Sequence, residues 1–263
     1  MKKKISSLSN PFIKNLLLLQ KKSKLRKSQE EFVIEGLQEI SYAQKAAYAF
    51  SQILVCLDLF DDTFDLEKFD CEITEISLEV FEKLAYRSST GGLIAIAKPK
   101  DLRIANLRLS SKTPLILIAE APEKPGNIGA LLRTSDAAKL DAIIIANPKT
   151  DLYNPNIIRS SVGTVFTNTI GVGTTSEIID FLNNNNIKIY AAALQDSSSY
   201  LIQDFKEATA IAVGTEHQGL SEEWRINADK IIQIPMEGQV DSLNVSVSAA
   251  ILIFEAKRQR QLS

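Results

Sequence analysis

Short apolar runs alternate with amphipathic stretches along most of the chain. An Asn10-Pro11 signal starts a helix that we expect to reach about residue 28. Helical patterns follow at 37–47 and 77–86, with an acidic helix near 61–69. The strands expected between these helices are residues 31–36, 52–58, 71–76 and 92–98. This alternation is typical of an α/β domain, in which helices cover a sheet.

The alternation stops at a polar stretch that begins with Pro99 and resumes after residue 113. We therefore expect a linker at 99–113, between a domain at 1–98 and a domain at 114–263. The strands expected in the second domain are residues 114–120, 141–147, 163–170, 188–194, 209–214 and 229–236. Helices are expected from Asn127, near 154–160, from Thr175 and at the C-terminal end. Because these strands are nearly continuous apolar runs, they predict a parallel sheet buried on both faces.

Composition narrows the class of protein without identifying it. The 263 residues are 45% hydrophobic and 24% charged, which is ordinary for a soluble globular protein. Cys56, Cys71 and a single histidine argue against a disulfide framework and a zinc site, and they fit a reducing cytoplasm. We expect neither a signal peptide nor a membrane span, because no apolar run is long enough for either.

Positive charge is concentrated at one end of a chain whose formal net charge is −2. Residues 1–27 contain no acidic residue. The basic residues in this segment are Lys2, Lys3, Lys4, Lys14, Lys21, Lys22, Lys24, Arg26 and Lys27. Phosphate recognition depends on local potential, so this run fits either an RNA-facing surface or a solvated helix face.

Residues 125–140, PGNIGALLRTSDAAKL, follow an expected strand and open an expected helix. Gly126 and Gly129 allow close backbone approach, and Asn127 is a candidate helix cap. Arg133 lies nearly two helical turns further along. Taken alone, this pattern also fits an ordinary strand-to-helix turn with an exposed arginine.

Residues 212–220, AVGTEHQGL, place Gly214 and Glu216 at the end of another expected strand. Ligands in open α/β sheets bind at the carboxyl ends of strands, although a solvated loop glutamate has the same pattern. The only histidine, His217, titrates near neutral pH, but no nucleophile pattern surrounds it. We therefore expect a surface or packing role for His217.

Residues 234–260 contain a strand end, a loop, the triplet Ser242-Leu243-Asn244 and a helix. Residues 245–254 are small or apolar nearly all round, which predicts a helix buried in the core or in a subunit interface. The phosphate-loop pattern GxxxxGK[ST] is absent from the chain. Gly171-Val172-Gly173 resembles the start of a dinucleotide fingerprint, but Ser176 stands where its third glycine would be.

Together and in this order, the three stretches resemble the signature motifs of the SpoU (TrmH) family of RNA ribose methyltransferases. Ser135 stands where many members have alanine. The first hundred residues resemble the family's RNA substrate-binding domain, which is similar to a ribosomal protein. The segments that carry this second resemblance are residues 9–14, 31–36 and 89–95.

The resemblance implies a SPOUT-type α/β fold with a deep trefoil knot in a mostly parallel sheet. Patterning alone would predict a simple doubly wound sheet, because true knots are rare. The resemblance also implies a homodimer whose active site is completed across the interface. The implied cofactor is S-adenosylmethionine, with no metal. The residues implied to bind this cofactor are Leu194, Gly214, Ile234, Met236 and Leu243.

The resemblance also implies a catalytic set. Arginine stays protonated in proteins, so Arg133 is expected to hold a phosphate and stabilise alkoxide charge, with a literal base role left open. Asn127 would orient Arg133 or the ribose, and Glu216 would hold Arg133 or its loop. Ser242 and Asn244 would order the cofactor loop and the ribose.

The expected reaction is methylation of a ribose 2′-hydroxyl in RNA, with 23S ribosomal RNA ranked first by analogy with members that carry the extra domain. The alternatives are a transfer-RNA ribose methyltransferase and a non-catalytic RNA-binding or ribosome-assembly factor that kept the fold. A nucleotide-dependent oxidoreductase is a third interpretation, which the missing glycine fingerprint disfavours.

Overall fold

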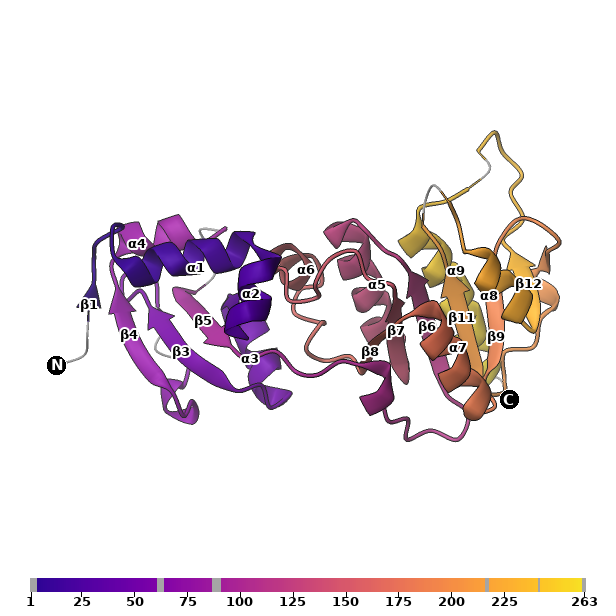
Figure 1. Cartoon of the computed structure of the whole chain (residues 1–263), viewed down its shortest axis with the longest axis horizontal. Coiled ribbons are helices and arrows are strands. Elements are labelled where there is room, and N and C mark those ends of the chain that lie inside the picture. Colours follow the sequence, from indigo (N-terminus) through magenta and orange to yellow (C-terminus); the bar gives the residue numbers. More distant parts are fainter. Residues whose placement is uncertain (1–3, 61–63, 87–90, 216–217, 241, 262–263) are drawn as a thin grey trace. The chain divides into compact units, whose positions relative to one another are not determined.

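The computed structural model describes residues 4–60, 64–86, 91–215, 218–240 and 242–261, which form two compact units. The first unit comprises Met1–Lys100 and Asp151–Thr167, and the second comprises Asp101–Thr150 and Asn168–Ser263. The chain therefore passes between the units three times, as the colours in Figure 1 trace.

A five-stranded mixed sheet, in the order β1-β4-β3-β5-β2, forms the centre of the first unit. β5 runs antiparallel to β2 and β3, whereas β1, β4 and β3 are parallel. The strands are β1 (Lys4–Ile5), β2 (Phe32–Glu35), β3 (Phe50–Val55), β4 (Glu72–Ile76) and β5 (Leu93–Ala97). The helices are α1 (Pro11–Lys21), α2 (Ser23–Gln29), α3 (Leu37–Lys45), α4 (Leu78–Leu84) and α6 (Pro155–Ser160), with a 3₁₀ turn η1 (Leu66–Lys68).

The expected single helix over residues 11–28 is wrong, because the chain is extended at Lys22 between α1 and α2. The break lets Arg26 turn inward. Its guanidinium donates to the carbonyls of Leu19 and Gln20, at 2.5 and 3.1 Å, and pairs with Asp151 at 2.6 Å. Arg26 of the basic run is therefore buried and has a structural role, whereas the lysines of α1 and α2 are exposed.

Residues 151–167 belong to the core of the first unit. Tyr153 stacks on Phe32 with ring centroids 4.3 Å apart, and Phe166 meets Tyr48 edge-on at 5.1 Å. The hydroxyls of Tyr48 and Tyr153 lie 3.3 Å apart, and burial raises the pKa of both phenols. These contacts explain why the strand expected at 163–170 is wrong: its first part forms turns that direct Phe166 into the aromatic cluster.

The second unit contains a seven-stranded sheet in the order β10-β12-β9-β11-β6-β7-β8, and every pairing in it is parallel. The expected parallel sheet is confirmed. Its strands are β6 (Leu115–Glu120), β7 (Ala142–Ala146), β8 (Ile170–Gly173), β9 (Lys188–Ala192), β10 (Ser198–Ser199), β11 (Thr209–Val213) and β12 (Lys230–Gln233). The helices are α5 (Pro125–Ala137), α7 (Thr175–Asn184), α8 (Glu222–Asn227) and α9 (Val245–Gln261), with 3₁₀ turns η2 (Ile104–Asn106) and η3 (Tyr200–Ile202).

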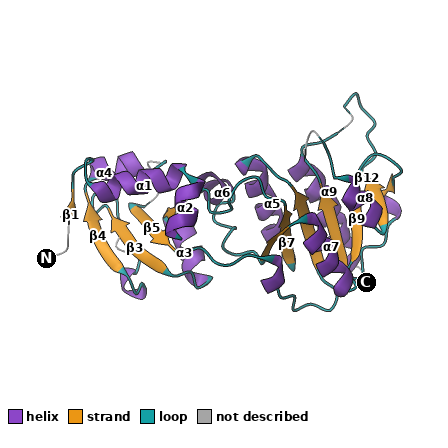
Figure 2. Ribbon diagram, viewed as in Figure 1, coloured by secondary structure: helices purple, strands orange, loops and turns teal. Residues whose placement is uncertain are grey.

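Helices cover both faces of this sheet (Figure 2). On one face, Ile178 and Leu182 of α7 and Trp224 of α8 pack with alternate strand residues such as Ile116 and Ile144. Helices α5 and α9 pack against each other, and they contact β7 and β11 respectively. Two-sided burial accounts for the continuous apolar runs of these strands.

Three sequence features take other roles in this unit. Asn127 is not the cap of α5, because the helix begins two residues earlier with Pro125 at its first position. Ile104 and Leu107, from the expected linker, are buried in the sheet core. Gly171 and Gly173 lie in β8, where an added Cβ would meet Ile104 within 3.1 Å, so close packing explains them better than a cofactor loop does.

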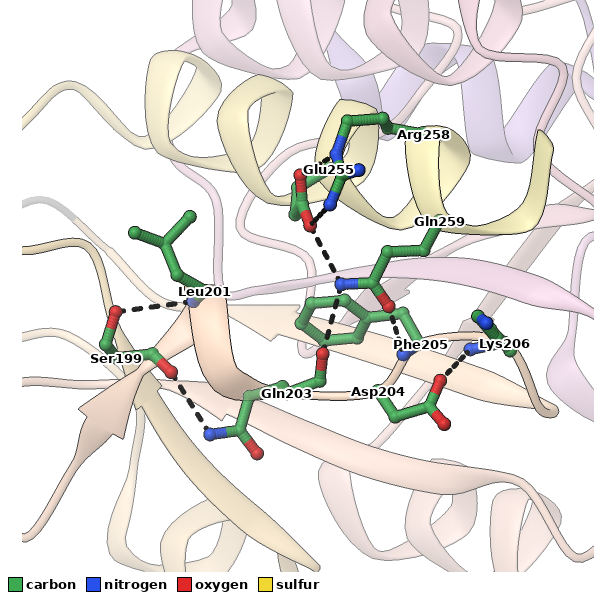
Figure 3. A network of polar contacts seen from close by, with 9 residues as sticks. All are labelled: Ser199, Leu201, Gln203, Asp204, Phe205, Lys206, Glu255, Arg258 and Gln259. Carbon is green, nitrogen blue, oxygen red and sulfur yellow. Dashed lines mark hydrogen bonds and ion pairs between the residues drawn. The ribbon is translucent and has the colours of Figure 1, made fainter. Parts of the chain in front are cut away.

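The end of α9 is tied to the segment between β10 and β11 (Figure 3). The Gln259 amide accepts from the Phe205 nitrogen at 2.9 Å and donates to the Gln203 carbonyl at 3.0 Å. Gln259 also donates to Glu255, whose carboxylate pairs with Arg258 at 2.7 Å.

Among the described residues, the structure contains no helix long and apolar enough to cross a membrane.

Candidate functional site

A cavity of about 470 Å³ opens at the carboxyl ends of three neighbouring strands, β12, β9 and β11. Its wall comes from residues at the ends of these strands and after them, within 192–195, 213–215, 218–220, 232–236 and 242–245, and from Ser248 and Leu252 of α9. Parallel strands bring these distant segments to one edge of the sheet, which is where α/β folds bind ligands. The volume lies in the range of small-molecule sites.

All five residues that the sequence singled out for a cofactor line this one cavity. They are Leu194, Gly214, Ile234, Met236 and Leu243. Leu194 is 57% exposed, whereas the other four are half-buried. Apolar side chains and loop backbone thus form much of the wall, together with polar groups such as Thr215 and Ser242.

Gly214 is required by the turn that closes one side of the cavity. Thr215 and Gly219 exchange backbone hydrogen bonds at 3.1 and 3.0 Å, which brings the chain back against itself. A Cβ on Gly214 would lie 2.0 Å from the carbonyl carbon of Gly219 and 2.3 Å from the nitrogen of Leu220. Because both atoms belong to backbone, no side-chain rotation could relieve the clash.

Arg225 is a cavity residue that the sequence reasoning missed. It lies on α8, and its guanidinium donates to Gln195 at 2.6 Å. Its Nε is buried and has no hydrogen-bond partner among the described residues. A buried donor without a partner is costly, so this cation suits a ligand that brings an acceptor such as a carboxylate. No motif marks Arg225, since one arginine in EEWRIN is typical of an exposed helix residue.

Two of the expected catalytic residues meet at the start of α9. The Asn244 amide donates to Asn127 at 3.2 Å, and its oxygen caps the helix by accepting from the Ser246 nitrogen at 3.0 Å. Ser242 lines the cavity two residues before Asn244. The Asn127–Asn244 hydrogen bond therefore links the start of α5 to the start of α9, two residues beyond the cavity residue Ser242.

Arg133 stands apart from this group within one chain. It is exposed on α5, does not line the cavity, and makes no hydrogen bond or ion pair with the described residues. Glu216, its expected partner, lies outside the described residues. The structure thus brings together Asn127, Asn244 and Ser242 but not Arg133.

Glu120 is a second residue that the sequence reasoning missed. It ends β6, is buried, and accepts from the Ser221 nitrogen at 2.7 Å, the Ser221 hydroxyl at 2.8 Å and the Thr175 hydroxyl at 3.0 Å. Ser221 directly follows residues 218–220, which line the cavity, so Glu120 anchors the chain where it leaves the cavity. The signal was a lone acidic residue that ends the apolar run PLILIAE.

Within the described ranges, no group of three or more histidine, cysteine, aspartate or glutamate side chains could hold a metal ion.

Comparisons with known proteins agree for both units. The model of the SpoU rRNA Methylase family matches residues 114–254, and that of the MRM3-like substrate binding domain matches residues 10–95. The 23S rRNA (guanosine(2553)-2'-O)-methyltransferase RlmP of Bacillus subtilis is 29% identical over 97% of this chain and 99% of its own length.

Solved structures give the same result. The crystal structure of an RNA 2'-O ribose methyltransferase is 39% identical, with a TM-score of 0.83, over 98% of this chain and 99% of that one. An AdoMet-bound rRNA methyltransferase from Sinorhizobium meliloti has the same fold, with 24% identity and a TM-score of 0.87 over 97% of both chains.

Proposed function

This chain belongs to the SpoU rRNA methylase family, and we propose that it transfers a methyl group from S-adenosylmethionine to a ribose 2′-hydroxyl in 23S ribosomal RNA. The cavity at the ends of β9, β11 and β12 carries this proposal, because it is lined by all five residues that match the family's cofactor positions. The RNA substrate is supported by relatives such as the Bacillus subtilis enzyme, which is named for 23S rRNA.

The residues of the cavity suit the proposed cofactor. Its apolar wall fits an adenosyl group, and Arg225 supplies a cation with an unpartnered donor for the methionine carboxylate. When bound, S-adenosylmethionine supplies an activated methyl group, and the protein supplies position and electrostatics. Gly214 and the segment that Glu120 anchors would set the backbone that contacts this ligand.

A ribose hydroxyl is a weak nucleophile, so it must be aligned and relieved of its proton. We assign Asn127, Asn244 and Ser242 to positioning the ribose and the cofactor loop, because Asn127 and Asn244 join α5 to α9 and Ser242 lines the cavity two residues earlier. Arg133 would hold the adjacent phosphate and stabilise negative charge on the hydroxyl oxygen. Its positive charge in all ordinary conditions suits that role.

A homodimer would complete this site. Arg133 does not line the cavity of its own chain, so a second chain is the source we propose for it. Val247 and Phe254 of α9 are 46% and 49% exposed and lie two turns apart on the same side of the helix, which supplies an apolar face for the pairing.

The family assignment also supports a trefoil knot in the second unit and a cytoplasmic location. The free thiols of Cys56 and Cys71 agree with that location.

The test is methylation of ribosomal RNA and, separately, of transfer RNA with tritiated S-adenosylmethionine. We expect label in ribosomal RNA that survives alkali, because a 2′-O-methyl group blocks cleavage at that position. Label in transfer RNA alone would mean that the substrate is transfer RNA and not ribosomal RNA. Absence of label from both, together with absence of cofactor binding by calorimetry, would refute the enzyme and favour an RNA-binding assembly factor.

Arg133→Ala should abolish methylation while cofactor binding persists, because Arg133 lies outside the cavity. Arg108→Ala, which removes another exposed arginine of the same unit, is the matched control. Co-expression of Arg133→Ala with Gly214→Ala, assayed at a cofactor concentration too low for the Gly214→Ala cavity, should restore activity if the arginine acts on the partner's cavity. An arginine that acts within its own chain would leave the mixture inactive.

A further inference from the structure

The first unit contains a second cavity, of about 280 Å³, that the proposed methyl transfer does not use. Its wall includes Glu35 at the end of β2, Gln38 of α3, Tyr86 after α4 and Arg159 of α6. Its residues come both from the first hundred positions and from the segment 151–167. We propose that this cavity binds one unpaired base of the RNA substrate, a base with an exocyclic amino group. The inference rests on the proposed function.

A flat cationic and aromatic pair forms one side of the cavity. The Arg159 guanidinium lies over the Tyr86 ring, 5.0 Å from its centroid, and donates to Asn156 at 2.9 Å. Tyr86 is 46% exposed, although a large aromatic side chain is usually buried in a stable core. Proteins that bind single-stranded RNA stack splayed bases on aromatic rings and on guanidinium planes.

Glu35 supplies a hydrogen-bond acceptor for the amino group of a base. Its carboxylate accepts from the Tyr86 nitrogen at 2.9 Å, so it lies beside the stacking pair. A carboxylate offers about four acceptor positions, and it accepts readily from the amino group of a base. Uracil has no amino group and offers a carboxylate only its N3–H, which is flanked by two carbonyl oxygens that repel the carboxylate, so this pairing disfavours uracil relative to bases with an amino group.

The surroundings fit a nucleotide better than an isolated base. Gln20, on the wall, ends the buried side of α1, and the exposed Lys21, Lys22 and Lys24 follow it directly in the chain. Exposed lysines that follow a wall residue in the sequence suit contacts to the phosphates that flank a splayed base. Because the family model of the first hundred residues is that of a substrate-binding domain, an RNA ligand is the occupant we assign.

Binding of fluorescent oligo(C), oligo(A) and oligo(U) to the full-length protein tests the proposal. We expect the wild type to bind oligo(C) and oligo(A) at least about fivefold more tightly than oligo(U). Tyr86→Leu and Arg159→Ala should each weaken binding of oligo(C) and oligo(A) by about tenfold. Glu35→Gln should remove the discrimination against oligo(U), because an amide can also donate to uracil O4.

Two further variants separate stacking from charge. Arg159→Lys keeps the charge without the plane, so it should remain close to Arg159→Ala. Lys45→Ala removes an exposed cation of the same unit outside the cavity and should bind like the wild type. Wild-type affinity in Arg159→Lys would reduce the site to a phosphate contact and overturn the proposal. Unchanged affinity in Tyr86→Leu would also overturn it.

The readout distinguishes this inference from the proposed function. If the wild type labels ribosomal RNA but the cavity variants bind oligonucleotides normally, only the base site fails. If the wild type labels no RNA, the proposed function fails, and the oligonucleotide result still decides the base site. Thermal unfolding of each variant confirms that weaker binding does not reflect misfolding.

Discussion

At the residue scale, the cavity depends on the absence of one side chain. Gly214→Ala would place a methyl group 2.0 Å from backbone of the returning turn. The turn must move, and overpacking of this kind costs about 1–3 kcal/mol. We expect cofactor affinity to fall about tenfold or more by calorimetry.

Gly238→Ala is the control for this change, because an added Cβ there meets no atom within 4 Å. It should bind the cofactor like the wild type. Equal affinity in Gly214→Ala and Gly238→Ala would mean that the close approach of Gly214 to Gly219 does not shape the ligand site.

Ser135 lowers the stability of the folded protein, because its buried hydroxyl is not hydrogen-bonded within the described ranges. Its side chain is fully buried on α5, and its hydroxyl has no hydrogen-bond partner among the described residues. Ser135→Ala should therefore raise the free energy of unfolding by up to about 1 kcal/mol, measured by urea denaturation. Ser161→Ala is the comparison, because the Ser161 hydroxyl donates to the Ile158 carbonyl at 3.0 Å. That variant should lose about 1 kcal/mol, and the same sign in both would contradict the argument.

At the element scale, the C-terminal part of helix α9 contains a carboxylate that pairs within the helix and titrates in acid. Hydrogen bonds from Arg258, and then from Gln259, lower the pKa of Glu255 from 4.5 to about 2. The stabilisation from this lowered pKa is complete above pH 4.5, and it is lost as the pH falls towards 2. In Glu255→Gln, the unfolding free energy should fall less steeply over that pH range, as measured by denaturant titrations. Glu237→Gln, at an exposed loop position, should keep the wild-type slope.

The elements also separate what patterning predicts from what it misses. Leu115–Glu120 is a continuous apolar run, and it became β6 as expected because both faces of the sheet are covered. The stretch at 163–168 was also expected to be part of a strand but forms turns, because Phe166 packs against Phe32 and Tyr48 instead of against a neighbouring strand. Period and propensity describe local chain geometry, so they carry no signal for such a distant partner.

The site shows the same division. The loops that line the cavity were predictable, because glycines and polar residues followed apolar strands in an order that resembles a known family. Arg225 and Glu120 were not, since their roles depend on which segments the sheet order brings together. The role of Arg133 as a partner's residue stays a prediction.

At the scale of the whole molecule, the first unit depends on a segment that arrives late in the chain. Without residues 151–167, Phe32 and Tyr48 lose two aromatic partners and Arg26 loses its carboxylate. Deletion of one large buried side chain costs about 3–5 kcal/mol, against a total stability of about 5–15 kcal/mol for a domain. A fragment of residues 1–100 should therefore lack a stable fold, and its circular dichroism should show no cooperative thermal transition.

The matched protein for that measurement is the same fragment joined to residues 151–167 by a flexible linker. It should recover near-ultraviolet signal and a cooperative melt. A fragment of 1–100 that melts at the temperature of the joined version would show that the aromatic cluster is dispensable.

The triple passage of the chain between the units has a consequence for inheritance. A substrate unit that ended at residue 100 could be exchanged between enzymes by a single recombination. Here residues 151–167 of that unit lie in the sequence between two segments of the other unit. Exchange by one crossover would pair Phe32 and Tyr48 with a foreign aromatic partner. The specificity unit and the unit that carries the chemistry must therefore diverge together.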